Sequence, residues 1–316
     1  MKTYEERLNS LLPWKEHEVP ADIPHGDMPG DKIEIGETHI AKANTIFPEL
    51  VKGLLPVIVK NDKERAVVSV CGGSGVGKSE IASVLAYFLN QAGIGAYILS
   101  GDNYPHRIPK YNDAERLHIF RESGIRGLVT AGEMTKEHFE LLHSWQEEET
   151  DADRKHMEEH PWMKAYLDAG RTGLTKYLGT PNETDFSEVS ERIRSFKEGA
   201  SSLWLRRMGR DEAALWYDEV DMKDVKVLII EWTHGNSDYL EGVDLPILLN
   251  STPAETLAHR RARNRDGKLD SAFTTMVLEI EQRKLHEQAH KAKIICSKDG
   301  ELLNYDEYKK RMDDQF

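Results

Sequence analysis

The chain has 316 residues, of which 39% are hydrophobic and 31% are charged, a balance that suits a soluble globular protein with a substantial core. Its formal net charge of −13 argues against a nucleic-acid partner, because phosphate backbones require a basic face. No apolar run reaches the roughly 18 residues that a membrane-spanning helix needs, and Met1–Arg7 lacks the apolar core of a signal peptide, so a cytoplasmic protein is expected.

Residues 1–60 form an N-terminal extension ahead of the first predicted strand. The extension is rich in prolines, which are Pro13, Pro20, Pro24, Pro29, Pro48 and Pro56. Because proline removes a backbone donor and interrupts helices, we expect Pro20–Gly36 to be irregular and Ile40–Leu55 to be a helix broken at Pro48. The sequence assigns no function to this extension.

A glycine-rich segment follows the apolar run Ala66–Val70 and precedes the predicted helix Glu80–Gln91. It matches the pattern G-x-x-x-x-G-K-[ST], the phosphate loop of nucleoside-triphosphate-binding proteins. Glycines let successive N–H groups turn inward around an anion, and the helix behind them adds the positive end of its dipole. The residues expected to bind the nucleotide are Gly72, Gly73, Ser74, Gly75, Val76, Gly77, Lys78 and Ser79.

Two side chains of this loop have distinct chemical roles. The Lys78 ammonium can bridge the β- and γ-phosphates as a compact charge, and the Ser79 hydroxyl can ligate Mg²⁺. The loop therefore predicts that a nucleoside triphosphate binds with magnesium. It does not say where the phosphoryl group goes.

A carboxylate, Asp102, follows the second predicted strand, Ala96–Leu99. Ligands of an open parallel sheet bind beyond the carboxyl ends of the strands, and we expect this strand to lie next to the phosphate loop. Asp102 would then project into the same crevice, where it can accept a proton from an attacking hydroxyl or hold Mg²⁺ through water. The alternative is an aspartate that only shapes the strand exit.

Residues 104–224 separate the second strand from the third, far more than an ordinary crossover needs. We expect a largely helical insertion that recognises the acceptor, acts as a lid and excludes water. Helical pieces are predicted at Thr135–Trp145, Glu188–Lys197 and Asp211–Tyr217.

The third predicted strand, Val225–Ile230, ends in Glu231. An acidic residue that closes an apolar strand is the usual second carboxylate on the metal side of these folds, so Glu231 is expected to organise Mg²⁺ together with Ser79. Trp232 and His234 come next. Contact with the acceptor and packing at the strand end are equally compatible with their positions.

A dense cationic run at residues 259–268 follows the fourth predicted strand, Leu245–Leu249, and a helix start at Pro253. A helix C-terminus attracts cations through its dipole, but four arginines exceed what this requires. We therefore expect a lid that closes over the phosphates and stabilises charge in the transition state. The arginines assigned to this role are Arg260, Arg263 and Arg265.

A fifth strand is predicted at Lys293–Cys296, after an amphipathic helix over Ser271–Ala292. Short apolar strands that alternate with helices indicate a parallel sheet covered on both faces. We predict a three-layer α/β fold of the P-loop NTPase type, with a five-stranded parallel sheet. Its core would comprise residues 61–103 and 225–316, beside the N-terminal extension and the insertion.

The chain resembles the uridine kinase and phosphoribulokinase-like branch of the P-loop kinases over about residues 64–103 and 225–298. The segments that carry the resemblance are the phosphate loop, Asp102-Asn103-Tyr104, Val227–Glu231 and the arginine run 260–266. It implies that Asp102 is the catalytic base and that ATP is the nucleotide. The family usually has glycine where this chain has Trp232, so the resemblance does not define the acceptor.

The leading hypothesis is an ATP- and Mg²⁺-dependent kinase that phosphorylates a hydroxyl of a small metabolite, a sugar or a nucleoside. Gly101-Asp102-Asn103 also resembles a short motif of adenylylsulfate kinases, which leaves that activity as an alternative. A protein of a different class, a nucleotide-gated regulatory P-loop protein, would respond to a protein partner rather than to a metabolite. The sequence does not predict the oligomeric state.

Overall fold

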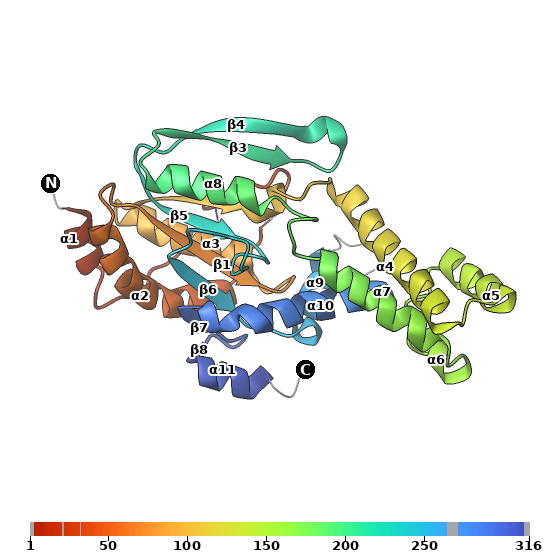
Figure 1. Cartoon of the computed structure of the whole chain (residues 1–316). Helices are drawn as coiled ribbons and strands as arrows, with labels where there is room; N and C mark the ends of the chain where they lie inside the picture. Colours follow the sequence, from red (N-terminus) through yellow and green to blue (C-terminus); the bar gives the residue numbers. More distant parts are fainter. Residues whose placement is uncertain (1–2, 21, 32, 264–270, 313–316) are drawn as a thin grey trace.

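The computed structural model describes residues 3–20, 22–31, 33–263 and 271–312, and the side chains of 259–263 lie outside the described part. A central sheet lies between layers of helices, and a helical arm extends from one end of the molecule (Figure 1). The strands of the sheet are β1 (Ala66–Gly72), β2 (Gly95–Ser100), β5 (Val225–Glu231), β6 (Leu245–Leu249), β7 (Ile294–Cys296) and β8 (Leu302–Leu303).

The sheet order is β2-β5-β1-β6-β7-β8. The first five strands in this order are parallel, which confirms the predicted parallel sheet and all five predicted strands. The expected number of strands was one too low, because β8 pairs antiparallel with β7 and its two residues are too few to show a pattern. Strand β5 lies between β2 and β1, so β2 is not the direct neighbour in the sheet of the strand that carries the phosphate loop.

Alternate side chains of the sheet face two separate cores. Val68 and Val70 of β1 pack with helices α2 (Glu37–Lys60) and α3 (Lys78–Gln91) on one face. Val67 faces the other side and packs with α8 (Phe186–Lys197). Burial on both faces accounts for the nearly continuous apolar runs of the strands.

Helix α2 continues through Pro48 to Lys60, so the expected break at this proline is wrong. The proline removes one helical hydrogen bond. However, the helix buries one whole face against the sheet and α3, including Phe47, Leu50 and Leu54, and this burial outweighs the local cost. The short helix α1 (Tyr4–Asn9) precedes it, and the described residues of the range 20–36 contain no helix or strand, as predicted.

The insertion between β2 and β5 begins with the short 3-10 helix η1 (Gly101–Asn103) and is largely helical, as predicted. Its helices are α4 (Pro109–Ala131), α5 (Lys136–Glu147), α6 (His156–Glu159), α7 (Met163–Tyr177) and α8. Helices α4 to α7 form the helical arm, in which α4 and α7 lie side by side (Figure 1). Gly127 permits this approach, since a Cβ there would lie 2.3 Å from the Ala169 Cβ.

A two-stranded hairpin of β3 (Ser202–Met208) and β4 (Leu215–Asp221) completes the insertion. The helix predicted at Asp211–Tyr217 is therefore wrong, since only the 3-10 turn η2 (Glu212–Ala214) is helical there. Strand β4 is exposed along almost all its length, so its sequence lacks the apolar alternation of a half-buried strand.

The C-terminal part contains α9 (Pro253–Arg263), α10 (Ala272–Gln288), the 3-10 turn η3 (Ala289–Lys291) and α11 (Tyr305–Met312). Helix α10 lies close to α7 and α9, so it connects the sheet to the helical arm. In the part of the chain that the structure describes, none of the helices is both long and apolar enough to cross a membrane.

Candidate active site

The phosphate loop connects the end of β1 to the start of α3. Gly77 is the N-terminal cap of α3 and has φ 94°, in the left-handed region that favours glycine. Gly72 passes so close to β6 that a Cβ there would lie 2.6 Å from the Leu249 carbonyl oxygen. The Lys78 ammonium donates a hydrogen bond of 3.1 Å to the Gly73 carbonyl. The loop therefore forms a closed turn with its lysine folded back over it.

Glu231 lies at the end of β5, directly beside this loop. Its carboxylate accepts hydrogen bonds from the Ser79 hydroxyl, at 3.0 Å, and from the Ser100 hydroxyl, at 2.5 Å. Burial, together with the nearby Asp102 carboxylate, raises the pKa of Glu231 to about 8. A buried carboxyl with such a pKa is poised to bind a cation, because a positive charge would offset the cost of ionisation.

The donor set suits magnesium. Mg²⁺ prefers oxygen ligands and usually takes only one or two from the protein, with the others from water and substrate phosphates. Ser79 and Glu231 provide two such oxygens side by side. Among the described residues, no group of three or more His, Cys, Asp or Glu side chains could hold a metal ion by itself.

Asp102 lies in η1, immediately after β2, and its side chain is exposed. It lines a cavity of about 370 Å³ that Ser74 of the phosphate loop also lines. Its charge contributes to the raised pKa of both Glu231 and Glu281. Although β2 is not the neighbour of β1, the two strands end at the same edge of the sheet, and this brings the carboxylate to the loop.

The wall of this cavity combines charged, hydroxyl and apolar side chains from five parts of the chain. The lining residues are Ser74, Asp102, Asp113, Arg116, Thr233, Phe273, Thr274, Val277, Leu278 and Glu281. Asp113 and Arg116 belong to α4, whereas Phe273 and Glu281 belong to α10. The insertion and α10 therefore supply most of the wall opposite the phosphate loop.

Arg116 is the central charge of this wall. Its guanidinium contacts Glu183 at 2.6 Å and Glu281 at 3.9 Å. Burial alone would lower the pKa of Arg116, but these carboxylates raise it. Burial alone would raise the pKa of Glu183. Arg116 and the other neighbouring donors outweigh this effect and hold the pKa below its usual value. Sequence reasoning missed these residues, because single charged residues inside helices and loops carry no local signal.

Trp232 is part of the packing beneath η1. It is 2% exposed, and its ring lies 4.9 Å from that of Phe186. A Cβ at Gly101 would lie 2.0 Å from the Trp232 ring, so the absence of a side chain at 101 makes room for the indole. Burial lowers the pKa of His234 to about 4, so its imidazole is neutral near pH 7.

The N-terminal extension also reaches the site. Asp27 hydrogen-bonds residues on both sides of Asp102. A Cβ at Gly26 would lie 3.9 Å from a Glu231 carboxylate oxygen. Nothing in the irregular sequence around these residues indicates this placement.

The expected lid lies mostly beyond the described side chains. Arg260 and Arg263 belong to α9, but their side chains lie outside the described part, and Arg265 lies outside the described residues. Their assignment to phosphate binding stays a prediction.

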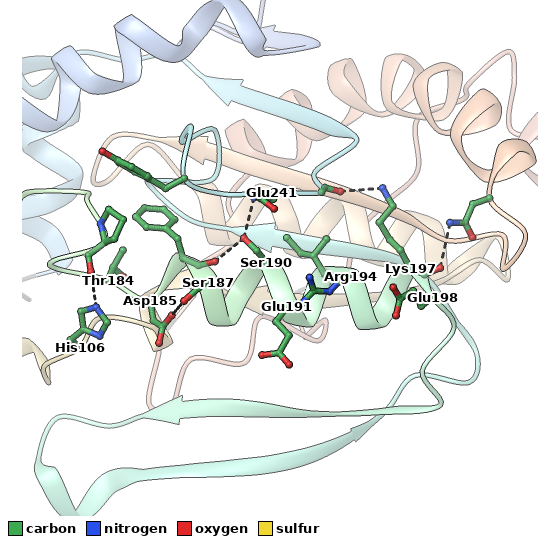
Figure 2. A pocket seen from close by; sticks show the side chains of 16 residues that line it. His106, Thr184, Asp185, Ser187, Ser190, Glu191, Arg194, Lys197, Glu198 and Glu241 are labelled. Atoms are coloured by element: carbon green, nitrogen blue, oxygen red, sulfur yellow. Dashed lines mark hydrogen bonds between the residues drawn. The ribbon is translucent and has the colours of Figure 1, made fainter.

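A larger groove of about 840 Å³ runs along α8 and shares no residue with the phosphate loop. Figure 2 shows hydrogen bonds among several of the residues that line it. Ser190, for example, accepts from the Glu241 amide and donates to the Phe186 carbonyl. The smaller cavity is the better candidate, because it brings a carboxylate to the phosphate loop.

A phosphate loop at the first strand of a parallel sheet, with carboxylates at the ends of two neighbouring strands, defines the three-layer P-loop fold. No family model matches the chain. It is 40% identical over 243 residues to the bifunctional alpha-galactosidase/sucrose kinase AgaSK of Mediterraneibacter gnavus. This match covers 77% of the chain, which spans about a fifth (21%) of the relative's length. The expected resemblance to P-loop kinases is confirmed.

Two solved structures with lower similarity were also found. One, from Silicibacter sp. TM1040, is provisionally described as a fructose transport system kinase, with 17% identity, a TM-score of 0.46 and coverage of 78% of this chain and 94% of the other. The second, from Bacillus stearothermophilus, is described as a possible uridine kinase, with 15% identity, a TM-score of 0.35 and coverage of 78% and 98%.

Proposed function

We propose that the protein is an ATP- and Mg²⁺-dependent kinase that transfers the γ-phosphate to a hydroxyl of a carbohydrate, with sucrose as the first candidate acceptor. The observation that carries this proposal is the cavity that Asp102 shares with Ser74 of the phosphate loop. It leaves room for an acceptor between a carboxylate and the place where the γ-phosphate would lie. The sequence similarity to AgaSK, whose name includes sucrose kinase, favours a sugar.

The cavity wall fits a carbohydrate. Sugars present hydroxyls that pair with carboxylates and guanidinium groups, and apolar ring faces that pack on aromatic side chains. Asp113, Arg116 and Glu281 offer the polar contacts, and Phe273 offers an aromatic surface beside them.

Each residue near the phosphate loop has a defined part in the proposed reaction. The loop amides and Lys78 would hold the triphosphate, and Ser79 and Glu231 would hold Mg²⁺, which neutralises phosphate charge when bound. Asp102 takes the proton of the acceptor hydroxyl as that oxygen bonds to the γ-phosphorus. The bond from the γ-phosphorus to the β–γ bridging oxygen breaks, and ADP leaves.

The test is an ADP-release assay over sucrose, other sugars, nucleosides and adenylylsulfate, with mass spectrometry of the phosphorylated product. We expect a sugar to raise turnover above basal ATP hydrolysis. Asp102→Asn should lower the rate roughly 100-fold or more, since it removes the general base. Asp238→Asn, which changes an exposed carboxylate outside the cavity, serves as the matched control.

The outcomes separate the competing hypotheses. Turnover with adenylylsulfate but with no sugar would favour the alternative kinase class. If no hydroxyl compound raises turnover above the basal rate, the kinase proposal fails and a nucleotide-gated binder becomes the better explanation.

A further inference from the structure

Asp27 lies in the irregular part of the N-terminal extension, yet its side chain is only 7% exposed. Its Oδ1 accepts hydrogen bonds from the Ser100 amide, at 2.7 Å, and from the Asn103 side-chain amide, at 3.0 Å. Its Oδ2 accepts from the Tyr97 hydroxyl, at 3.0 Å, and from the Arg207 guanidinium, at 2.9 Å. One carboxylate therefore joins the extension to β2, to η1 and to the hairpin.

The two Oδ1 contacts lie on either side of Asp102. Ser100 is the last residue of β2, and Asn103 is the last residue of η1. The Asn103 side chain is fixed at its other end too, because its Oδ1 accepts from the Met208 amide at 2.9 Å. Asp27 therefore restrains the turn that carries Asp102 at both of its ends.

The same turn is linked to the metal side of the site. The Ser100 hydroxyl donates to Glu231, while the Ser100 amide donates to Asp27. A shift of this residue would therefore change the separation between Glu231 and Asp102. Errors of about 1 Å in such a separation can lower a rate 100-fold.

We infer that Asp27 is a positioning residue, which holds η1 so that the Asp102 carboxylate faces the acceptor hydroxyl. The inference rests on the proposed function of Asp102. It assigns a role to the N-terminal extension, which supplies part of the support of the active site. The Oδ2 contacts with Tyr97 and Arg207 anchor the carboxylate, and the Oδ1 contacts transmit that anchoring to the turn.

Two substitutions of Asp27 distinguish an effect on the position of Asp102 from an effect on the stability of the fold. Asp27→Asn keeps an oxygen that can accept from Ser100 and Asn103 but loses the ion pair with Arg207. Asp27→Ala loses both sets of contacts. Both variants should lower the melting temperature. Asp27→Ala alone should lower kcat with sucrose, by roughly 10- to 100-fold, and leave the KM for MgATP within about twofold, since the phosphate loop is untouched.

Hydrogen exchange gives a readout that does not depend on the acceptor. The amides of residues 100–103 should exchange faster in Asp27→Ala than in the wild type and stay protected in Asp27→Asn. If Asp27→Ala does not fold, Asn103→Ala replaces it, because this variant removes the side chain that Asp27 holds. The same loss of kcat is then expected.

Arg65→Met is the matched control. Arg65 is 5% exposed and donates three hydrogen bonds, to the carbonyls of Phe196, Ala200 and Met222. Its loss should also lower the melting temperature but leave kcat and exchange at 100–103 unchanged.

Equal kcat values for Asp27→Ala and Asp27→Asn, or unchanged exchange at 100–103 in Asp27→Ala, would overturn the inference. If Asp102→Asn itself keeps full activity, the proposed function of that carboxylate fails instead. If Asp102→Asn is inactive and Asp27→Ala is fully active, only the positioning role fails.

Discussion

Replacing Glu231 by glutamine tests whether nucleotide binding requires an ionised carboxylate at the end of β5. The pKa of Glu231 is raised to about 8 in the free protein, so at pH 7 roughly nine-tenths of the molecules carry the proton. Ionising the group at pH 7 costs about 1.4 kcal/mol. Since Mg²⁺ binds the ionised form, the affinity for MgADP should rise about fivefold from pH 7 to pH 8 and level off above pH 9.

Isothermal titration calorimetry measures this directly. MgADP is titrated at pH 7, 8 and 9 in two buffers with different ionisation enthalpies, which reveals how many protons are released on binding. Glu231→Gln should bind more weakly, with an affinity that does not change over this range. Glu287→Gln, at an exposed position outside the cavity, should keep the wild-type slope. A wild-type affinity that is flat from pH 7 to pH 8 would refute the reasoning.

The raised pKa of Glu231 also determines how the stability of the folded protein changes with pH. In the unfolded chain the pKa of a glutamate is near 4.5, whereas in the folded protein that of Glu231 is about 8. Between these values the folded state binds the extra proton, so the contribution of this group to stability falls as the pH rises. Glu231→Gln lacks the titration, and its melting temperature relative to the wild type should therefore increase from pH 6 to pH 8 in thermal denaturation without nucleotide.

Two further predictions concern the helical arm and the cavity wall. Arg116→Leu leaves the buried Glu183 carboxylate without its closest cation, which should cost about 3 kcal/mol in urea denaturation and raise the KM for the acceptor more than that for ATP. An acceptor KM equal to that of the wild type would remove Arg116 from the proposed acceptor site. Gly127→Ala places a methyl group 2.3 Å from the Ala169 Cβ, and should cost about 1–3 kcal/mol. Adding Ala169→Gly should restore part of this loss, and an unchanged loss would contradict close packing of α4 on α7.

The sheet and the phosphate loop could be predicted because their signals are local. Buried parallel strands such as Val225–Glu231 are continuous apolar runs, and the glycine loop between β1 and α3 is a contiguous motif. The direct hydrogen bond between Ser79 and Glu231 follows from topology, since parallel strands end at one edge of the sheet. Local sequence patterns, together with the common edge at which parallel strands end, were therefore enough to predict that these distant residues lie together.

The remaining parts of the site depend on contacts that no local pattern encodes. Asp27 lies in a segment without helix or strand, and Arg116 is one of several charged residues on a long helix. Each is placed in the site by contacts with partners more than 60 residues away. At Pro48 a local signal is misleading instead. The proline predicts a break in the helix, but burial of one whole face of α2 keeps the helix continuous.

Two structural supports meet at the turn that carries Asp102. A Cβ at Gly101 would collide with the Trp232 ring, so the glycine makes room for the indole beneath η1. The indole supports η1 from the α8 side, through Phe186, while Asp27 holds η1 through hydrogen bonds from the N-terminal extension. Because both supports act on η1, changes in either one are expected to alter where Asp102 meets an acceptor.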